Sequence, residues 1–284
     1  MKKLTVFCAA ACLAASAAAQ NHPDLHEVLD RQKGRNLIEI PKGTYTLDVR
    51  SNGPYKFHNL TDVHINGNGS TVICNNQEQA FSFYNCVRVE LHDLTIDYDP
   101  LCFTQGEITA VAEDGSWFDV RIDEGYPVTG LAANRVQFYD PQTRLLKRNS
   151  ITTYTSNYSA LKQLGHNLFR AVKNGTWSAG EQVGDLVVMD VKTDKPNAGV
   201  HTVMLNKCYN TKLENVTVYG SNTFSFFEKE GYANEYRNCV VDRGPMPQGI
   251  RPRLRSGNAD GIHSSQARKG PTVTGCKVGH NGDD

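Results

Sequence analysis

The chain has no surplus of charge of either sign. Its 284 residues include 30 Lys and Arg against 30 Asp and Glu, a formal net charge of zero. A protein that binds nucleic acid or an anionic membrane surface carries clusters of basic residues, so both classes are excluded. Disorder is excluded as the main state as well, because 39% of the residues are apolar and only 21% are charged.

Long apolar runs are almost absent. The one stretch, at residues 4–15, follows two lysines and precedes three alanines at 17–19. This is the arrangement of a secretory signal, and the stretch is too short for a membrane helix. We predict residues 1–19 to be a signal peptide and the mature protein to be periplasmic or secreted, with a lipid anchor at Cys12 as the alternative.

Cysteine is too scarce for a disulfide scaffold. No Cys-x-x-Cys or Cys/His spacing suggests a zinc site, and we expect neither a metal nor a cofactor. Several cysteines fall at matching places in a repeat, so we expect most of them to be small buried thiols, with bridges as the alternative. Six lie outside the predicted leader: Cys74, Cys86, Cys102, Cys208, Cys239 and Cys276.

Helix-forming runs are also few, and short strand-like segments repeat in their place. The three clearest copies are FSFYNCVRVELHDLTID from Phe81, TVMLNKCYNTKLENVTVY from Thr202 and SFFEKEGYANEYRNCVVD from Ser225. Each contains an Asx residue followed by an apolar-x-apolar triplet. The step from Asn215 to Asn238 is 23 residues, and a fourth copy at Gly275 lies 37 residues further on, or 23 plus a loop of 14.

Apolar runs of strand length that recur with a step of this kind, with no helix between them, are typical of a parallel β-solenoid. One coil cannot bury its inner face alone, so stacked coils make the core. A β-propeller blade needs about 40 to 45 residues, and an antiparallel sandwich does not explain the fixed step. An amphipathic segment at residues 23–33 is expected to be a short helix that caps the first coil.

The repeat disappears between residues 104 and 197. Longer alternating runs there, such as 117–123 and 183–191, are separated by turn dipeptides such as Asp140-Pro141. We interpret this stretch as an antiparallel β module inserted into the solenoid. The predicted all-β organisation is a signal peptide at 1–19, a cap and first coils at 20–104, the inserted module at 105–197 and further coils at 198–284.

Three carboxylates gather at the end of the sequence. Asp260, in the segment Asn-Ala-Asp-Gly-Ile-His, precedes Asp283 of a Gly-Asp-Asp tripeptide by 23 residues, the length of one coil. Neighbouring coils are about 4.8 Å apart, so Asp260 is predicted to lie beside Asp283 or Asp284. Repulsion among ionised carboxylates that close favours protonation of one of them. A protonated carboxyl beside an ionised one is what acid/base cleavage of a glycosidic bond requires.

Other interpretations of these acids stay open. Asx residues form ladders at solenoid corners without any catalysis, and a group of acids can hold a cation such as calcium. We favour catalysis. Repulsion between Asp260 and an Asp-Asp pair would lower the stability of the fold, so a functional role explains the arrangement better than a structural one.

These residues resemble a known group. An NADG segment one coil before GDD, on a parallel β-helix, is similar to polygalacturonase-type glycoside hydrolases. The segments at 94–106 and 253–284, the first followed by an inserted module, resemble more closely the bacterial α-1,3-galactosidases that trim blood-group-B-type glycans. The resemblance implies a right-handed, pectin-lyase-like parallel β-helix and cleavage of terminal α-linked galactose. It implies no cofactor, and its partner molecule would be a galactose-containing glycan.

By this resemblance the mechanism is inversion. Asp283 would protonate the departing glycosidic oxygen, while Asp260 and Asp284 would hold and activate a water on the opposite face. Successive strand residues point to opposite faces, so Asp283 and Asp284 can serve one site only where the chain bends. Gly282 is compatible with such a bend.

Two further residues are candidate substrate ligands. His263 follows Asp260 by three residues and could donate to a sugar hydroxyl, or it could be an ordinary structural histidine. Arg255 belongs to a basic loop with Arg251 and Arg253. We expect this loop to be solvated. The alternative is that it binds an anionic sugar, which would favour a galacturonide over neutral galactose.

Two competing functions stay open. A polysaccharide lyase on the same scaffold would use calcium and an Arg or Lys base, and a solenoid that only binds carbohydrate would need no catalytic acid. Proteins of the resembled type continue with further coils after the Gly-Asp-Asp tripeptide. We therefore expect C-terminal coils to be missing from the sequence as given, and activity to depend on them.

Overall fold

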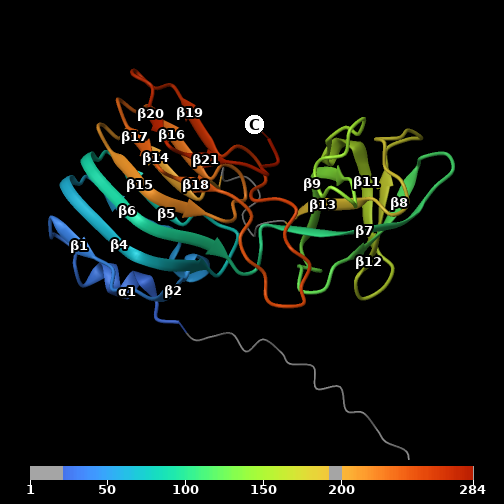
Figure 1. The fold of residues 1–284 in the computed structure, drawn as a ribbon, viewed down its shortest axis with the longest axis horizontal. Coiled ribbons are helices and arrows are strands. Elements are labelled where there is room, and N and C mark those ends of the chain that lie inside the picture. The colour runs from blue at the N-terminus through green and yellow to red at the C-terminus, as the bar shows by residue number, and fades with distance from the viewer. Residues whose placement is uncertain (1–21, 192–199, 284) are drawn as a thin grey trace, which may run out of the picture.

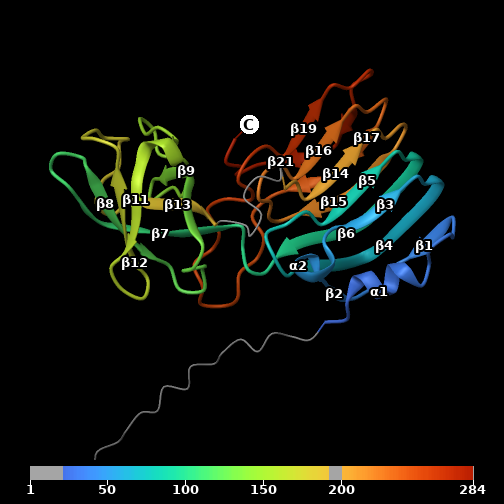
Figure 2. The same cartoon turned by 180° about the vertical axis from the view of Figure 1, so that it is seen from behind.

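The computed structural model describes residues 22–191 and 200–283, which are built almost wholly of β-strands. The predicted signal peptide and Asp284 lie outside the described residues. Figure 1 shows a stack of coils, formed by the first and last parts of the chain, beside a separate sheet formed by its middle part. The same two bodies are seen from behind in Figure 2.

A nine-stranded parallel sheet forms one wall of the stack. Its main path runs through β1 (Leu37–Glu39), β4 (Thr61–Cys74), β6 (Val87–Tyr98), β15 (Lys212–Val218), β17 (Glu235–Arg237) and β20 (Thr272–Thr274). Beside this path, β2 (Thr44–Leu47) pairs with β4, and β18 (Val240–Val241) pairs with β15 and with β21 (Lys277–Val278).

A five-stranded parallel sheet forms a second wall. It runs through β3 (Tyr55–His58), β5 (Phe81–Tyr84), β14 (Val203–Asn206), β16 (Phe226–Lys229) and β19 (Ile262–Ser265). Buried residues of the two sheets share one hydrophobic core, which includes Phe57, Phe83, Leu213 and Val216. This is the arrangement in which stacked coils bury inner faces that a single coil would expose.

The strand register confirms the predicted repeat. Lys212 of β15 pairs with Glu235 of β17, a step of 23 residues, and Glu235 pairs in turn with Thr272 of β20, a step of 37. On the other wall Phe81 pairs with Val203, so the coils resume their register on either side of the middle part of the chain.

The repeated Asx residues mark corners of the coils. Asp93, Asn215 and Asn238 have φ angles of 57°, 53° and 52°, in the left-handed region that Asn and Asp tolerate better than most residues. Asn215 Nδ2 donates to Asp93 Oδ1 at 2.8 Å, so the corners form a ladder. Gly275 takes the next corner, where an added Cβ would come within 2.3 Å of Asn238 Oδ1.

A short helix covers the first coil, as the sequence predicted. Helix α1 (Leu25–Asp30) begins at Asp24, whose side chain accepts a hydrogen bond from the His26 backbone N–H. Leu25 and Leu29 are fully buried in the coil core. The only other α-helix among the described residues is the single turn α2 (Val49–Asn52). No helix of the described part of the chain is long and apolar enough to cross a membrane.

The middle of the chain forms a seven-stranded antiparallel sheet with its own core around Phe118, Phe138 and Val187. We placed an inserted antiparallel module at 105–197; the described strands extend from Phe103 to Val191, and residues 192–199 lie outside the described part. A 3₁₀ turn, η1 (Thr155–Asn157), joins two of the strands. In order across the sheet they are β10 (Thr153–Tyr154), β9 (Leu131–Tyr139), β13 (Leu186–Val191), β7 (Phe103–Val111), β8 (Trp117–Ile122), β12 (Leu168–Lys173) and β11 (Tyr158–Gln163).

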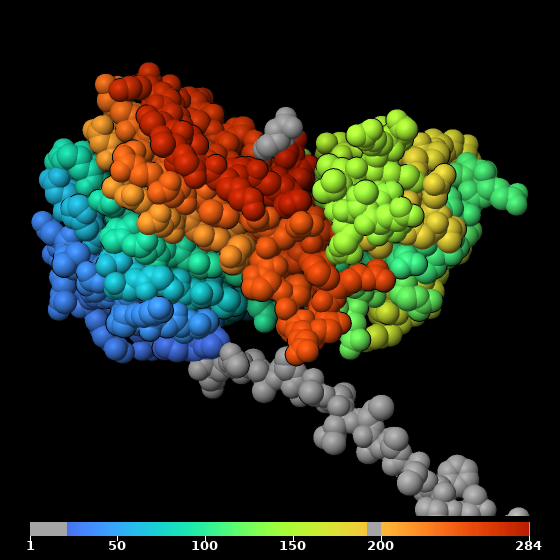
Figure 3. Space-filling model, viewed as in Figure 1, coloured from blue at the N-terminus to red at the C-terminus, as the bar shows by residue number. Residues whose placement is uncertain are grey.

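Figure 3 shows the surface hollowed where the C-terminal residues meet this antiparallel sheet. Asp283 lies at this junction, where Arg135 of the antiparallel sheet donates to its side chain.

Candidate functional site

The last turns of the described chain lie side by side. Gly282 N–H donates to the Gly257 carbonyl at 2.9 Å, and Ser256 Oγ donates to Asn281 Oδ1 at 2.6 Å. The Gly282–Gly257 bond spans 25 residues, whereas the bond from Glu235 N–H to the Thr211 carbonyl spans 24 where the coil step is 23, so the step is longer here than predicted. A turn can take up extra residues without disturbing the strand ladders, and the one after β21 does so with His280 at a φ of 61°.

This register places the acids in adjacent coils but not directly opposite each other. The Asp283 side chain and the Asn258 carbonyl both accept hydrogen bonds from the guanidinium of Arg135. Asp260 lies two residues beyond Asn258 in the same turn. Within the described residues, no hydrogen bond joins Asp260 to Asp283. The third acid of the prediction, Asp284, lies outside the described residues.

Asp260 is held by a histidine. Its Oδ2 lies 2.6 Å from Nδ1 of His263, and the Asp260 side chain is 21% exposed. The Asp260 carbonyl accepts from Ser225 N–H at 3.0 Å, which fixes the backbone against the preceding coil. The structure thus brings these two candidate residues into contact, and the carboxylate orients the imidazole so that Nε2 is left for another partner.

Three rings stack face to face beside this pair. The Phe224 ring lies 4.2 Å from the His263 ring at an interplanar angle of 1°, and on its other side 4.8 Å from the His201 ring at 6°. Phe227 packs against the edge of the same group, with its centroid 5.6 Å from that of His263. The stack restricts rotation of His263 and so fixes the direction from which it meets Asp260.

His201 is the neutral member of the stack. Thr223 Oγ1 donates its proton to the Val200 carbonyl at 2.7 Å, so His201 Nδ1, 2.8 Å from the same oxygen, must be the donor in that contact. Burial, and secondarily the charge of His263, lowers the pKa of His201 to about 4. His201 is therefore uncharged at neutral pH and serves as a stacking partner.

Asp283 is held from the antiparallel sheet. Arg135 of β9 donates from Nη2 to Asp283 Oδ2 at 2.9 Å and from Nη1 to the Asn258 carbonyl at 2.6 Å. Gln137, two residues further along the same strand, donates to the Gly282 carbonyl at 2.9 Å. One strand of the inserted sheet thus fixes both the backbone and the side chain at the proposed acid.

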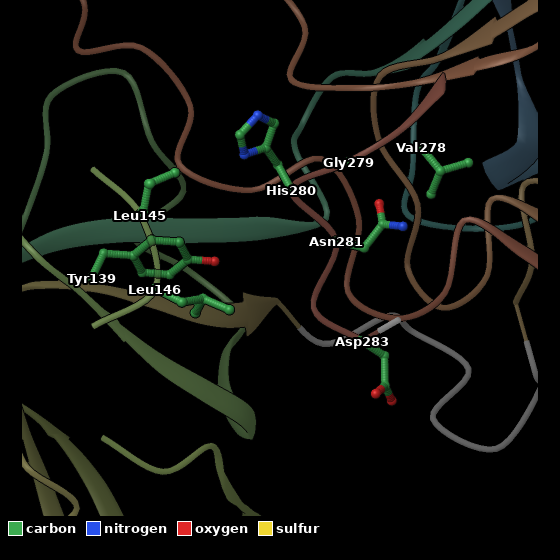
Figure 4. Close-up of a pocket in the computed structure, with 8 residues that line it drawn as sticks. All are labelled: Tyr139, Leu145, Leu146, Val278, Gly279, His280, Asn281 and Asp283. Atoms are coloured by element: carbon green, nitrogen blue, oxygen red, sulfur yellow. The ribbon is translucent and has the colours of Figure 1, made fainter. Parts of the chain in front are cut away.

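A cavity of about 410 Å³ opens beside Asp283. It is lined by Tyr139, Leu145 and Leu146 of the inserted sheet and by residues 278–281 and Asp283 of the last turns. Figure 4 shows the first three side chains on one side of the space and those of Val278, Asn281 and Asp283 on the other. Asn281 also lies against Gly261, where an added Cβ would be 2.9 Å from its Nδ2, so Asn281 contacts both the cavity and the residue that follows Asp260.

The prediction of a solvated basic loop is wrong for two of its three arginines. Arg255 is completely buried, and its Nη2 donates to Asp190 Oδ1 at 2.6 Å and to Asn258 Oδ1 at 2.7 Å. Arg253, 4% exposed, forms a two-bond pair with Asp97 at 2.7 and 2.8 Å. A buried charge needs a partner of this kind, and here the partners come from strands far away in the sequence.

Arg255 is therefore not a direct substrate ligand in this structure. Its guanidinium joins the inserted sheet to the turn that carries Asp260, because Asp190 lies on β13 and Asn258 in that turn. Arg251 is the exposed member of the three, and it pairs with Asp123 at 3.1 Å and Glu107 at 3.4 Å. Sequence reasoning missed Arg135 altogether, because nothing near it in the sequence indicates that it meets Asp283.

Glu228, a further carboxylate on β16, points into the coil core and is fully buried. It accepts from Asn234 Nδ2 at 2.9 Å and Ser264 Oγ at 3.4 Å, and burial raises its pKa.

All six cysteines of the described chain are free and five are buried, which agrees with the expectation of buried thiols. Residues 22–191 and 200–283 contain no cluster of three or more His, Cys, Asp or Glu that could hold a metal ion.

Comparison with known proteins gives little further guidance. The chain matches no protein-family model and no curated protein. Among solved structures it is similar to the Gp54 tailspike of Acinetobacter baumannii bacteriophage AP22, in complex with capsular saccharide, with 12% identity and a TM-score of 0.24 over 92% of this chain and 53% of that one.

A second similar structure is the tailspike protein gp49 of Pseudomonas phage LKA1, with 12% identity and a TM-score of 0.23 over 82% of this chain and 48% of that one. The chain spans about half the length of both tailspikes. Likenesses at these TM-scores carry no argument about its activity, which must come from the site itself.

Proposed function

We propose that the protein is an exported glycoside hydrolase that removes terminal α-linked galactose from glycans with inversion, on a right-handed parallel β-helix. The observation that carries the proposal is the position of Asp260 and Asp283. They come from adjacent coils, Asp283 lines the cavity at the junction with the inserted sheet, and each carboxylate is held by a basic side chain, Arg135 for Asp283 and His263 for Asp260. Two positioned carboxyl groups are the minimum that glycoside hydrolysis requires.

In the proposed mechanism Asp283 protonates the departing oxygen, while Asp260, oriented by His263, and Asp284 activate a water on the opposite face. The ion pair with Arg135 adds one condition to this scheme. As the acid, Asp283 must enter the reaction with a proton on one carboxyl oxygen, while the other oxygen accepts from Arg135 Nη2. Half of the Asp283 side chain is exposed, so solvent can supply that proton.

The pairing of the three arginines favours a neutral sugar over a uronate. Recognition of a uronate needs a cation that is free to meet its carboxylate. Arg253 and Arg255 are buried in ion pairs, and Arg251 has two acidic partners of its own. The basic loop was the reason to consider a pectin-type hydrolase or lyase. Because its arginines are already paired, neutral galactose is the better candidate.

The test is hydrolysis of an aryl α-galactoside, with the anomer of the released sugar followed by NMR. We expect β-galactose to appear first. Asp260→Asn and Asp283→Asn should each lower kcat by about 10²-fold or more, because each removes an acid or base from the reaction. Asp114→Asn, in an exposed turn of the inserted sheet, is the matched control and should have the activity of the unmodified chain.

Other outcomes would contradict the proposal in different ways. Release of the α-anomer would show retention. Glycan binding that is unaffected by either substitution, without turnover, would show a non-catalytic binding protein. A chelator-sensitive, ultraviolet-absorbing product from polygalacturonate would show a lyase.

A further inference from the structure

The cavity beside Asp283 takes one of its walls from the inserted sheet. That wall is a tight turn after β9, in which Tyr139 pairs with Leu146 across an antiparallel bridge. Asp140 closes the turn: its N–H donates to the Leu145 carbonyl at 2.9 Å, and its Oδ1 accepts from Thr143 N–H at 2.7 Å. The turn is therefore held by its own hydrogen bonds and presents a defined surface.

Two leucines are exposed on this turn. Leu145 and Leu146 are 54% and 51% exposed, and neither belongs to the core of the inserted sheet. Lys147, which follows them, is anchored by bonds to the Gly180 carbonyl at 2.9 Å and Asp185 at 2.6 Å. Two adjacent leucines on an anchored turn give the cavity an apolar side that faces the polar groups of the last coil.

The opposite side of the cavity combines the apolar Val278 with polar groups and carries no free positive charge. It presents Asn281, Asp283 and His280, and the cation nearest to Asp283 is its own partner Arg135. Burial, followed by the charge of Arg243, lowers the pKa of His280, so that imidazole is neutral at pH 7. A carboxylate on a ligand would meet only the negative charge of Asp283 here, whereas hydroxyl groups would find both donors and acceptors.

A sugar ring matches such a cavity, because a pyranose has an apolar face of C–H groups and an edge of hydroxyls. The volume of about 410 Å³ falls within the usual range for small-ligand sites, roughly 300–1,000 Å³. We infer that the inserted sheet supplies a subsite for a neutral sugar unit, packed on Leu145 and Leu146, on the leaving-group side of the bond that is cut. The side is assigned because Asp283, at the edge of the cavity, is the group proposed to protonate the leaving oxygen.

This inference rests on the proposed function, so its test separates the two. The full chain and a Leu145→Ser/Leu146→Ser variant are compared on α-galactosyl fluoride, whose leaving group needs no subsite, and on a disaccharide with α-1,3-linked galactose. We expect the ratio of the two kcat/KM values, disaccharide over fluoride, to fall about tenfold in the variant, equivalent to about 1.4 kcal/mol of lost binding to the leaving sugar. Leu164→Ser, at an exposed leucine elsewhere on the inserted sheet, is the control and should leave the ratio unchanged.

A ratio that stays the same in the double variant would overturn the subsite, as would an equal fall in the Leu164→Ser control. Saturation-transfer NMR with the same disaccharide gives a readout without turnover. If the disaccharide binds and the double variant loses that binding while no substrate is hydrolysed, the proposed function fails and the subsite stands. If the disaccharide does not bind the unmodified chain, the subsite inference is wrong.

Discussion

The guanidinium of Arg135 joins two turns of the chain that lie far from it in the sequence. Its Nη2 is 2.9 Å from Asp283 Oδ2, across 148 positions, and its Nη1 is 2.6 Å from the carbonyl of Asn258. Since Arg135 belongs to the inserted sheet and the other two residues belong to the coils, the candidate acid is positioned by both bodies together. The inserted sheet is thus part of the site.

Replacing Arg135 with Met should reveal this positioning in the kinetics. We expect kcat/KM on an aryl α-galactoside to fall about tenfold, because the carboxylate loses its fixed direction. Arg170→Met, which removes an ion pair with Asp119 elsewhere on the sheet, is the control. An unchanged kcat/KM in the Arg135→Met variant would show that Arg135 does not position the acid.

The arginines of the turn before Asp260 should differ sharply in their effect on stability. Arg255→Met leaves Asp190 buried without its cation, and we expect the free energy of unfolding to fall by about 3–5 kcal/mol. Arg251→Met breaks only exposed pairs and should cost about 1 kcal/mol or less. Urea denaturation of the two variants measures the difference. Equal losses would show that Arg255 is not a structural link between the two bodies.

The stack of rings should support the function of Asp260. Phe224→Leu removes the ring between His201 and His263 and allows His263 to turn, so kcat should fall about tenfold while KM changes little. Phe224→Tyr keeps the ring and should retain most of the activity. Steady-state kinetics on an aryl α-galactoside decide the question. A leucine variant with unchanged kcat would reduce the stack to a packing role.

His201 should make the protein less stable in mild acid. Its pKa is lowered from 6.5 to about 4 in the folded state, so the unfolded chain binds more protons between these values. The stability that the neutral ring contributes is complete above pH 6.5 and is lost as the pH falls toward 4, with a slope of at most about 1.4 kcal/mol per pH unit. His201→Phe keeps a ring against Phe224 and should lose less stability over that interval. Denaturant midpoints at pH 7 and pH 5 measure this, and parallel losses in both proteins would contradict it.

The stability of this variant at pH 7 provides an internal check. The phenylalanine ring cannot replace the hydrogen bond from His201 Nδ1 to Thr223 Oγ1 at 2.8 Å. We therefore expect a small loss at pH 7, about 1 kcal/mol. Only the change in the free energy of unfolding between pH 7 and pH 5 reports on protonation of His201.

The local pattern was enough to predict the coils. The step from Asn215 to Asn238 appears in the sequence as a spacing and in the structure as the strand register of β15 and β17. Each inner position recurs once per coil, because only stacking can bury it, so the repeat can be recognised in the sequence. The sequence also named Asp260 and His263 as candidates three residues apart, but their contact with each other is seen only in the structure.

The chemistry at the junction was decided by the tertiary structure alone. The ion pairs of Arg255 with Asp190 and of Arg135 with Asp283 join residues far apart in the sequence. No pattern in the surrounding sequence predicts either contact. The turn before Gly282 makes the last step longer than 23 residues because turns, unlike strands, have no ladder to keep their length constant. The sequence by itself therefore determined the stacked coils and which acids are candidates, while the docking of the inserted sheet decided how Asp283 is held and which arginines are removed from solvent.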